Sequence, residues 1–361
     1  MEDLGLNQDF WRGRRVVLTG HTGFKGSWLV LLLESLGARI TGISLPPTPG
    51  SLFEQIDGQE RCSHNICDIR DFDSTRDIIA SAEPAIIFHL AAQPLVRQSY
   101  RDPLETIGTN VLGTANVLEA ARGVERLQAI VSVTTDKCYV NDGRRSGYVE
   151  TDRLGGHDPY SNSKACAELI TQCFRDSFFK ARGIGVASAR AGNVIGGGDY
   201  ASDRLIPDVV RALGSGQRPE LRNPTSVRPW QHVLEPLHGY CLLAEKLTGD
   251  ARSFAKGWNF GPSQDDTASV ATVVDQLARH WGGSGKFGPQ HGDHPHEAEV
   301  LNLDSGMAMR ELGWKSRLPL KTAVEWTADW YRARSGGADA AQLCTDQIRR
   351  FSAMHAVEAA A

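Results

Sequence analysis

Short apolar runs that alternate with helix-length segments are the feature of this sequence that most constrains its fold. The apolar runs cover residues 16–19, 40–45, 85–91, 129–133 and 185–189. The helical patterns between them include residues 27–36, 73–81, 106–121 and 161–179. Strands joined by helical crossovers pair in parallel, and a parallel sheet is buried on both faces. The first half of the chain is therefore predicted to be α/β, a doubly wound parallel sheet of the Rossmann type.

The alternation stops after Arg190, where a glycine-rich loop and a stretch rich in arginine and proline follow. Further on, residues 258–260 have the pattern of a strand. Helical patterns cover residues 205–213, 269–281 and 321–331. This change of rhythm indicates a second, smaller and mostly helical lobe.

The length of 361 residues exceeds what one ordinary domain needs. We predict a Rossmann domain over residues 1–192, to which part of 229–260 returns. A C-terminal substrate lobe is predicted over residues 193–335. Residues 336–361, rich in Ala, Arg and Gln, are expected to be a peripheral segment.

Composition and charge indicate a globular protein, with 41% hydrophobic and 23% charged residues. The net charge of −4 gives no general attraction for nucleic acid or anionic lipid, so neither partner is expected. The longest apolar run, Trp28 to Leu33, is too short to cross a bilayer, and residues 1–11 lack the pattern of a secretory signal. Seven scattered cysteines without a C-x-x-C pair favour reduced thiols and a cytoplasmic location.

Three glycines, Gly20, Gly23 and Gly26, lie between the first predicted strand and the first predicted helix. Without a Cβ atom, the backbone there can approach a pyrophosphate, and the helix N-terminus directs unpaired N–H groups at the anion. The position therefore predicts a dinucleotide site. Lys25, inside this turn, either contacts phosphate or is simply solvated.

The acidic residue that usually binds the adenosine ribose is missing. It should stand at the end of the second strand, where Thr41 to Leu45 include no Asp or Glu, and no arginine follows to mark a 2′-phosphate pocket. The choice between NAD and NADP therefore stays open at this point. Asp68 is either an adenine contact or an exposed carboxylate in a turn.

A tyrosine and a lysine four residues apart, Tyr160 and Lys164, fall on one face of a predicted helix. A nearby cation favours the phenolate and is expected to lower the phenol pKa, so that Tyr160 can accept a hydroxyl proton. Thr135, Asp136 and Lys137 follow a predicted strand at its carboxyl end, where open α/β sheets bind ligands. The alternative for Asp136 and Lys137 is a surface ion pair at a strand end.

Taken together, these motifs resemble the extended short-chain dehydrogenase/reductase family. The matching segments are Thr19 to Gly26, His89 to Gln93, Asn110 to Thr114, Thr134 to Tyr139, Tyr160 to Lys164 and Arg228 to Val233. Within that family the sequence is most similar to the CDP-D-glucose 4,6-dehydratases. That subgroup is matched by Gly20 to Trp28, Thr135 to Tyr139, Gly155 to Tyr160 and Gly196 to Asp199.

The resemblance implies an NAD-dependent hydro-lyase of deoxysugar biosynthesis, such as that of O-antigen lipopolysaccharide, and it implies roles for single residues. Tyr160 would take the proton of the C4 hydroxyl, while Thr135 steers the oxygen and Lys164 holds Tyr160 and the ribose. Asp136 would protonate the departing C6 hydroxyl and Lys137 would remove the C5 proton.

Binding residues follow from the same resemblance. NAD is expected to contact Gly20, Thr22, Gly23, Phe24, Lys25, Gly26, Asp68, Ile69, Leu90, Ala91, Ala92, Gln93, Asn110, Tyr160 and Lys164. The sugar nucleotide is expected to contact Asn193, Arg204, Arg228, Asn259 and His296. The other arginines nearby, Arg211, Arg218 and Arg222, are expected at the solvated surface.

Other functions and sites stay open or are set aside. Another nucleotide-sugar dehydratase for dTDP-glucose or GDP-mannose, a 4-epimerase and a non-catalytic NAD-binding sensor are the alternatives. His291, His294 and His296 match no firm metal-ligand spacing, so no metal site is predicted. Relatives pair the helices at 106–121 and 161–179, which implies a homodimer or a dimer of dimers.

Overall fold

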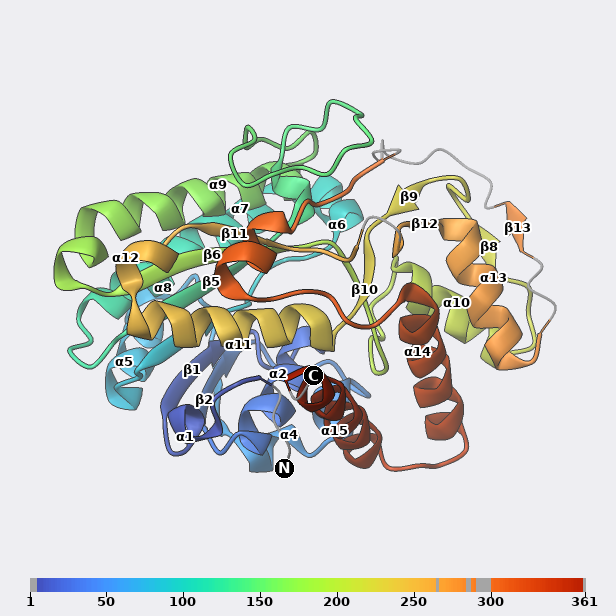
Figure 1. Cartoon of the computed structure of the whole chain (residues 1–361), viewed down its shortest axis with the longest axis horizontal. Coiled ribbons are helices and arrows are strands. Elements are labelled where there is room, and N and C mark those ends of the chain that lie inside the picture. Colours follow the sequence, from blue (N-terminus) through green and yellow to red (C-terminus); the bar gives the residue numbers. More distant parts are fainter. Residues whose placement is uncertain (1–4, 264–265, 284–286, 290–299, 360–361) are drawn as a thin grey trace.

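The computed structural model describes residues 5–263, 266–283, 287–289 and 300–359, and a seven-stranded parallel sheet is its centre (Figure 1). In spatial order the strands are β11 (Gly257–Phe260), β6 (Gly185–Ala191), β5 (Ala129–Thr135), β4 (Ile86–His89), β1 (Arg15–Thr19), β2 (Arg39–Ser44) and β3 (Ser63–Ile66). The predicted α/β fold is confirmed.

Alternate side chains of each central strand enter two separate cores. Val16 and Leu18 of β1 belong to the larger core, whereas Val17 between them belongs to the smaller one. On the larger side lie α2 (Phe24–Ser35) and α11 (Leu234–Gly249); on the other side lie α5 (Phe72–Ala82), α8 (Gly113–Arg122) and α9 (Pro159–Phe174). Both faces are covered, which explains why these strands read as continuous apolar runs.

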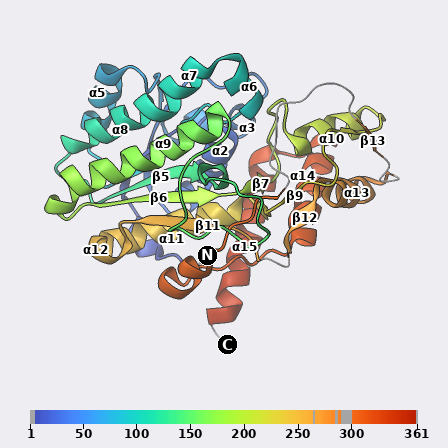
Figure 2. The same ribbon diagram turned by 90° about the horizontal axis from the view of Figure 1, so that it is seen from above.

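A second group of elements lies beside the carboxyl ends of the strands, on the right of Figure 1 and in the view from above in Figure 2. It contains α10 (Leu205–Gly214), α13 (Val270–Trp281) and α14 (Leu320–Ser335). Three short pairs of strands also belong to this group. They are β7 (Asn193–Ile195) with β10 (Trp230–His232), β9 (Val227–Arg228) with β12 (Ala268–Ser269), and β8 (Glu220–Leu221) with β13 (Gly288–Pro289). The exact domain boundaries stay a prediction.

The C-terminal helix α15 (Ala340–Ala359) differs from the expected peripheral segment. Cys344, Ile348 and Phe351 are buried in the larger core, and α15 packs against α2 and α14. The spacing of four and three residues places these side chains on one helical face. The many alanines and charges around them obscured this narrow apolar stripe in the sequence.

The remaining helical segments are short or connect the larger elements. They are α1 (Gln8–Trp11), α3 (Leu52–Gln55), α4 (Gly58–Arg61), α6 (Val96–Arg101), α7 (Pro103–Ile107), η1 (Gly108–Leu112), η2 (Asp136–Cys138), η3 (Arg175–Phe179), η4 (Lys180–Arg182), α12 (Ala251–Phe254) and η6 (Ala308–Leu312). None of the helices in the described part of the chain has the length and apolar character that a bilayer span needs. All seven cysteines are free thiols.

The glycine turn between β1 and α2 gives a test of the fold. A Cβ atom on Gly26 would overlap the carbonyl oxygen of Gly20, whereas a Cβ on Gly23 would lie 3.4 Å from the same oxygen. Gly26→Ala is therefore expected to destabilise the protein by about 2–3 kcal/mol, because overpacking against rigid backbone outweighs the better helix propensity of alanine. Thermal unfolding measures the difference. Gly23→Ala, the matched control, should unfold near the wild-type temperature; equal stability of both variants would contradict the packing argument.

Candidate active site

A cleft of about 1550 Å³ opens at the carboxyl ends of β1, β4, β5 and β6. Its walls come from the sheet domain on one side and from the second group of elements, including α10 and β9, on the other. This is the edge at which open parallel sheets bind ligands. Tyr160, Thr135, Lys137 and Lys164 all line the same cleft, so the structure brings the predicted reactive side chains together.

The glycine turn forms one end of the cleft. Gly20 has a left-handed φ of +76°, and a Cβ there would lie 2.7 Å from the backbone nitrogen of Ala91. The turn thus packs directly on the loop after β4 and leaves bare backbone at the N-terminus of α2, as an anion site requires. Predicted dinucleotide contacts that line the cleft are Gly20, Thr22, Gly23, Phe24, Lys25, Gly26, Asp68, Ile69, Leu90, Ala91, Ala92, Tyr160 and Lys164.

Two predicted dinucleotide contacts, Gln93 and Asn110, are not among the residues that line the cleft. Asn110 is buried, accepts a hydrogen bond from the Gln93 backbone nitrogen at 2.8 Å and donates one to Ser163 Oγ at 2.9 Å. The Gln93 side chain is held by Leu95 and Thr106. Both residues therefore hold the loop after β4 in place, and their direct contact with the cofactor stays a prediction.

Beside the glycine turn, hydroxyl groups stand where a ribose-binding acid was expected. Thr22 Oγ1 and Ser44 Oγ lie 2.7 Å apart, and both residues line the cleft. Asp68 also lines it, and its carboxylate is held by Arg70 at 2.5 Å. Asp68 therefore faces the cleft and forms an ion pair with Arg70 in a turn, while its contact with adenine stays a prediction.

Helix α9 is docked on β5 by a series of polar contacts. The Tyr160 hydroxyl forms a hydrogen bond with Thr135, and Lys164 Nζ donates to the carbonyl oxygen of Val133 at 2.9 Å. One turn further on, Thr134 Oγ1 donates to Glu168, and Thr171 then contacts Ser132 at 3.3 Å. Each turn of the helix thus meets one residue of the strand, and the tyrosine and lysine are set in a defined register.

The pKa of the Tyr160 phenol differs from the sequence prediction. Burial raises it to about 12, and the hydrogen bond with Thr135 only partly offsets this. Burial also lowers the pKa of Lys164 to about 8, although Glu168 opposes that shift. In this structure Lys164 donates to the backbone of β5, and desolvation of the phenol outweighs any stabilisation by the amine. The expected lowering of the phenol pKa was therefore wrong.

Asp136 and Lys137 form an ion pair, but not one on the surface. Asp136 is fully buried, and its Oδ1 accepts hydrogen bonds from Thr135 Oγ1 at 2.9 Å and Lys137 Nζ at 3.2 Å. Lys137 lines the cleft, and its Nζ also lies 3.5 Å from Asn193 Oδ1. Asp136 itself does not line the cleft. It is hydrogen-bonded to the Thr135 hydroxyl and the Lys137 ammonium group, and these two residues do line it.

Among the predicted substrate residues, Asn193, Arg204 and Arg228 line the cleft. Asn259 does not, because it is fully buried and its side-chain amide is bonded to Tyr139, Tyr148 and Asp304. Asn259 thus contacts protein groups in this structure, and its contact with the substrate stays a prediction. His296 lies outside the described residues.

Among the cleft residues that were not predicted for it are three charged ones. Arg222, expected at the solvated surface, lines the cleft and donates to the carbonyl oxygen of Asp203 at 3.2 Å. Arg97, on α6, pairs with Asp203 at 2.8 Å and joins the two walls. Asp203 itself has a left-handed φ of 62°, which is uncommon outside glycine. The one feature of the sequence that could have indicated a role for Arg97 in the cleft is its position shortly after the Ala91-Ala92-Gln93 motif.

No group of three or more His, Cys, Asp or Glu side chains in the described residues has the arrangement of a metal site. His291, His294 and His296, which were considered as metal ligands from the sequence, all lie outside the described residues.

The chain is similar to several nucleotide-sugar enzymes. A family model described as GDP-mannose 4,6 dehydratase matches residues 17–327. The CDP-glucose 4,6-dehydratase of Salmonella typhimurium is 48% identical over 92% of this chain and 95% of that protein. The dTDP-glucose 4,6-dehydratase of Shigella flexneri is 23% identical over 89% of this chain and 93% of that protein.

Solved structures share the fold. A double mutant of the dTDP-glucose 4,6-dehydratase from Streptomyces venezuelae, with NAD bound, superposes with a TM-score of 0.78 and 23% identity, covering 91% of this chain and 99% of that one. UDP-glucose 4-epimerase from Thermotoga maritima gives a TM-score of 0.77 and 21% identity, covering 89% and 99%. From the extent of the family match and the 48% identity over nearly the whole chain, this protein belongs to the GDP-mannose 4,6 dehydratase family within the extended short-chain dehydrogenases/reductases.

Proposed function

We propose that the protein converts CDP-D-glucose to CDP-4-keto-6-deoxy-D-glucose with NAD as a cofactor that is regenerated in each cycle. The main support is the convergence of Thr135, Lys137, Tyr160 and Lys164 on one cleft, with Asp136 hydrogen-bonded directly behind them. The choice of CDP-glucose is supported by the 48% identity to a CDP-glucose 4,6-dehydratase. The product would enter deoxysugar biosynthesis, as for O-antigen lipopolysaccharide, and the free thiols favour the cytoplasm.

The cleft fits a dinucleotide at its glycine end. A Cβ on Gly20 would fill space against Ala91, and the bare turn leads into the N-terminus of α2, where a pyrophosphate is favoured. Thr22 and Ser44 offer hydroxyl groups, and no carboxylate, to the adenosine ribose. Bound NAD supplies a hydride acceptor for C4 and later the hydride donor for C6, so that no external reductant is consumed.

The first step oxidises the sugar at C4. Tyr160 takes the proton from the C4 hydroxyl oxygen, and Thr135, hydrogen-bonded to Tyr160, orients that oxygen. Because burial holds the pKa of the phenol near 12, positive charge beside it is needed to make the phenolate accessible, and Lys164, one helical turn further on, would supply such a charge. The product of this step is a 4-ketone, which acidifies the C5 proton.

The second step removes water across C5 and C6. The step uses the neutral form of the Asp136–Lys137 pair, in which the proton of the ion pair has moved from Lys137 Nζ to Asp136. Neutral Lys137, which faces the cleft, takes the C5 proton, and Asp136 passes its proton through the Thr135 hydroxyl to the departing C6 oxygen, which leaves as water. Return of the proton from Lys137 to C5 completes the 4-keto-6-deoxy product. A 4-epimerase needs only the tyrosine redox step, so this acid and base would have no task in it. A non-catalytic sensor would need none of the five groups.

The substrate assignment is tested by incubating the purified enzyme with CDP-glucose, dTDP-glucose, UDP-glucose and GDP-mannose. The alkali-stable absorbance of a 4-keto-6-deoxy product is expected with CDP-glucose above the other three. Turnover of another nucleotide sugar without turnover of CDP-glucose would overturn the choice of substrate. Formation of a 4-epimer without the keto product would overturn the reaction class.

Two substitutions separate the two chemical steps. Tyr160→Phe is expected to lower oxidation at C4 by about a hundredfold or more, because general-base catalysis is lost. Asp136→Asn should still allow oxidation, seen as reduced nicotinamide, but should block loss of water. Asp346→Asn, at an exposed position on α15, is the matched control and should behave as wild type. Full dehydration by Asp136→Asn would disprove its role as the acid.

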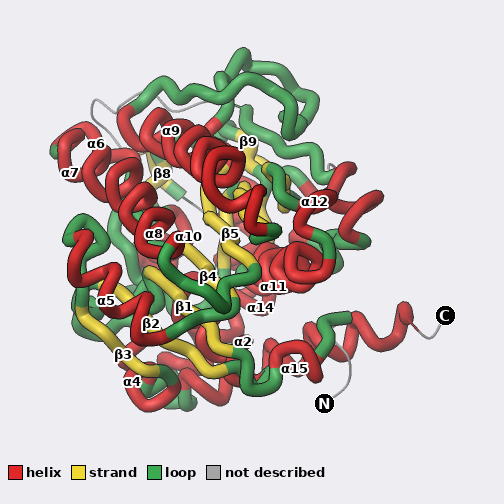
Figure 3. Tube along the Cα trace, turned by 90° about the vertical axis from the view of Figure 1, so that its left-hand side faces the viewer, coloured by secondary structure: helices red, strands yellow, loops and turns green. Residues whose placement is uncertain are grey.

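We further propose that the protein is a homodimer. Large apolar side chains are exposed on α7, η1 and α9. Helices α7 and α9 are labelled in the upper left part of Figure 3. The residues are Leu104, Ile107, Leu112 and Leu169, with exposed fractions of 79%, 47%, 56% and 54%. A second copy of the chain could cover this face with the same helices, as in a two-fold interface.

Placing charge on this face tests the dimer. Leu104→Asp combined with Leu169→Asp is expected to give a monomer in light scattering after size exclusion, because two charges would be buried without partners. Met309→Asp, at an apolar position on η6 that is also 54% exposed, serves as the control and should leave the dimer intact. A wild-type protein that is monomeric, or a double variant that stays dimeric, would contradict the proposal.

A further inference from the structure

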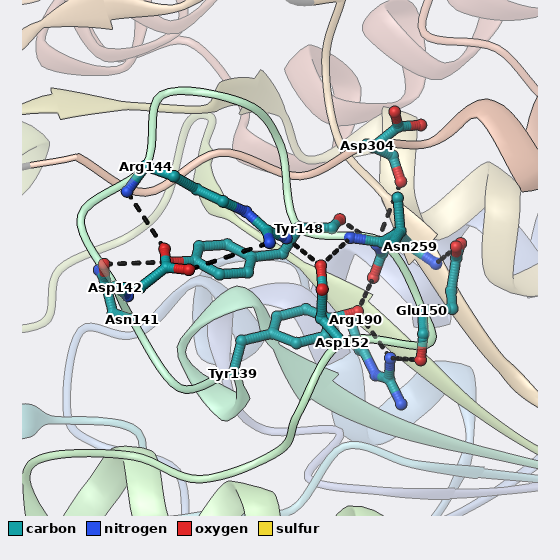
Figure 4. A network of polar contacts seen from close by, with 11 residues as sticks. Tyr139, Asn141, Asp142, Arg144, Tyr148, Glu150, Asp152, Arg190, Asn259 and Asp304 are labelled. Carbon is teal, nitrogen blue, oxygen red and sulfur yellow. Dashed lines mark hydrogen bonds and ion pairs between the residues drawn. The ribbon is translucent and has the colours of Figure 1, made fainter.

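The amide of Asn259 is the centre of a polar network beside the cleft, drawn in Figure 4, and Tyr139 of this network lines the cleft. Its Oδ1 accepts a hydrogen bond from the Tyr139 hydroxyl at 2.7 Å, and its Nδ2 donates to the carbonyl oxygens of Tyr148 at 2.8 Å and Asp304 at 3.1 Å. The Asn259 backbone nitrogen donates to Glu150 at 3.0 Å. Both hydrogens of Nδ2 are thus used and Oδ1 already accepts one hydrogen bond, and the side chain joins β11 to the loop between η2 and α9.

The ring of Tyr139 is fixed as firmly as its hydroxyl. It stacks on Tyr148 with the ring centroids 5.3 Å apart and an angle of 13° between the planes. The guanidinium of Arg190 lies 5.0 Å from the Tyr139 ring centroid and donates to its hydroxyl at 2.6 Å, and Arg144 covers the outer face of Tyr148 at 4.2 Å. Two cations thus enclose two stacked rings, an arrangement that favours one ring orientation.

This network is linked to both reactive segments. Tyr139 directly follows η2, the turn that carries Asp136 and Lys137, so a fixed Tyr139 limits how far Lys137 can move. In the other direction, Arg190 forms a buried ion pair with Glu168 at 2.8 Å, and Glu168 lies one helical turn after Lys164 on α9. The network therefore sets the base at the end of β5 relative to the tyrosine and lysine of α9.

We propose that Tyr139 and Asn259 are positioning residues that hold Lys137 where it can remove the C5 proton. This inference rests on the proposed function. Hydride transfer depends on Tyr160, which is positioned by its own contacts between α9 and β5. Loss of the network therefore affects the elimination step more than the oxidation step.

The test uses Tyr139→Phe and Asn259→Ala in the full-length enzyme with NAD and CDP-glucose. Tyr139→Phe keeps the stacked ring and removes only the hydroxyl that contacts Asn259 and Arg190. We expect kcat for the keto product to fall about tenfold, which is the effect of one well-placed hydrogen bond, with KM unchanged. Reduced nicotinamide should accumulate during turnover, and exchange of the C5 hydrogen with solvent should slow.

Tyr240→Phe is the matched control, because Tyr240 is also fully buried and its hydroxyl has no hydrogen-bond partner among the described residues. It should retain wild-type turnover without accumulation of reduced nicotinamide. The double variant of Tyr139 and Asn259 should be no slower than the slower single variant, because both act on one network.

The outcomes separate this proposal from the proposed function. If wild-type enzyme does not convert CDP-glucose, the proposed function fails. If wild type converts it and Tyr139→Phe slows both steps equally, or neither, the positioning role is disproved. Should Asn259→Ala not fold, Tyr139→Phe alone decides the question.

Discussion

The docking of α9 on β5 is the contact on which the rest of the site depends. Neither element alone holds a complete reactive set, because Tyr160 and Lys164 are on the helix and Thr135 ends the strand. Apolar packing alone would allow the helix to slide or rotate over a smooth strand surface, whereas directional hydrogen bonds define one register. The Glu168–Arg190 pair adds a large penalty to any other register, since breaking a buried ion pair costs about 3–5 kcal/mol.

Burial at this contact has a chemical consequence as well as a structural one. Desolvation disfavours every charged form, so it raises the pKa of Tyr160 to about 12 and lowers that of Lys164 to about 8. Both shifts favour neutral side chains in the resting cleft. The Tyr160 phenol therefore becomes a proton acceptor only when further positive charge lies beside it. It reacts mainly when a ligand occupies the cleft. The contact between α9 and β5 therefore sets the register of the helix through its hydrogen bonds and the pKa of the phenol through its burial.

How much the sequence predicted depends on whether a feature is local. The alternation of apolar runs predicts the parallel sheet, and the spacing of Tyr160 and Lys164 predicts their common face, because both patterns follow from backbone geometry. Asn259 could not be assigned in this way: its amide is used by Tyr139 and Asp304, which are distant in sequence. The pKa of Tyr160 was mispredicted because spacing shows a neighbouring cation but not the degree of burial.

Charge explains why an acidic chain can still bind an anionic ligand. The whole chain carries −4, yet Lys25, Lys137, Arg204 and Arg228 all line one cleft. Burial, with Arg204 as the next cause, lowers the pKa of Lys25 to about 7, so this amine is only partly charged at neutral pH. A phosphate group placed beside it favours the ammonium form and raises its pKa again. Binding of an anion and uptake of a proton are therefore coupled at Lys25, and the cleft gains positive charge as its negative ligand arrives.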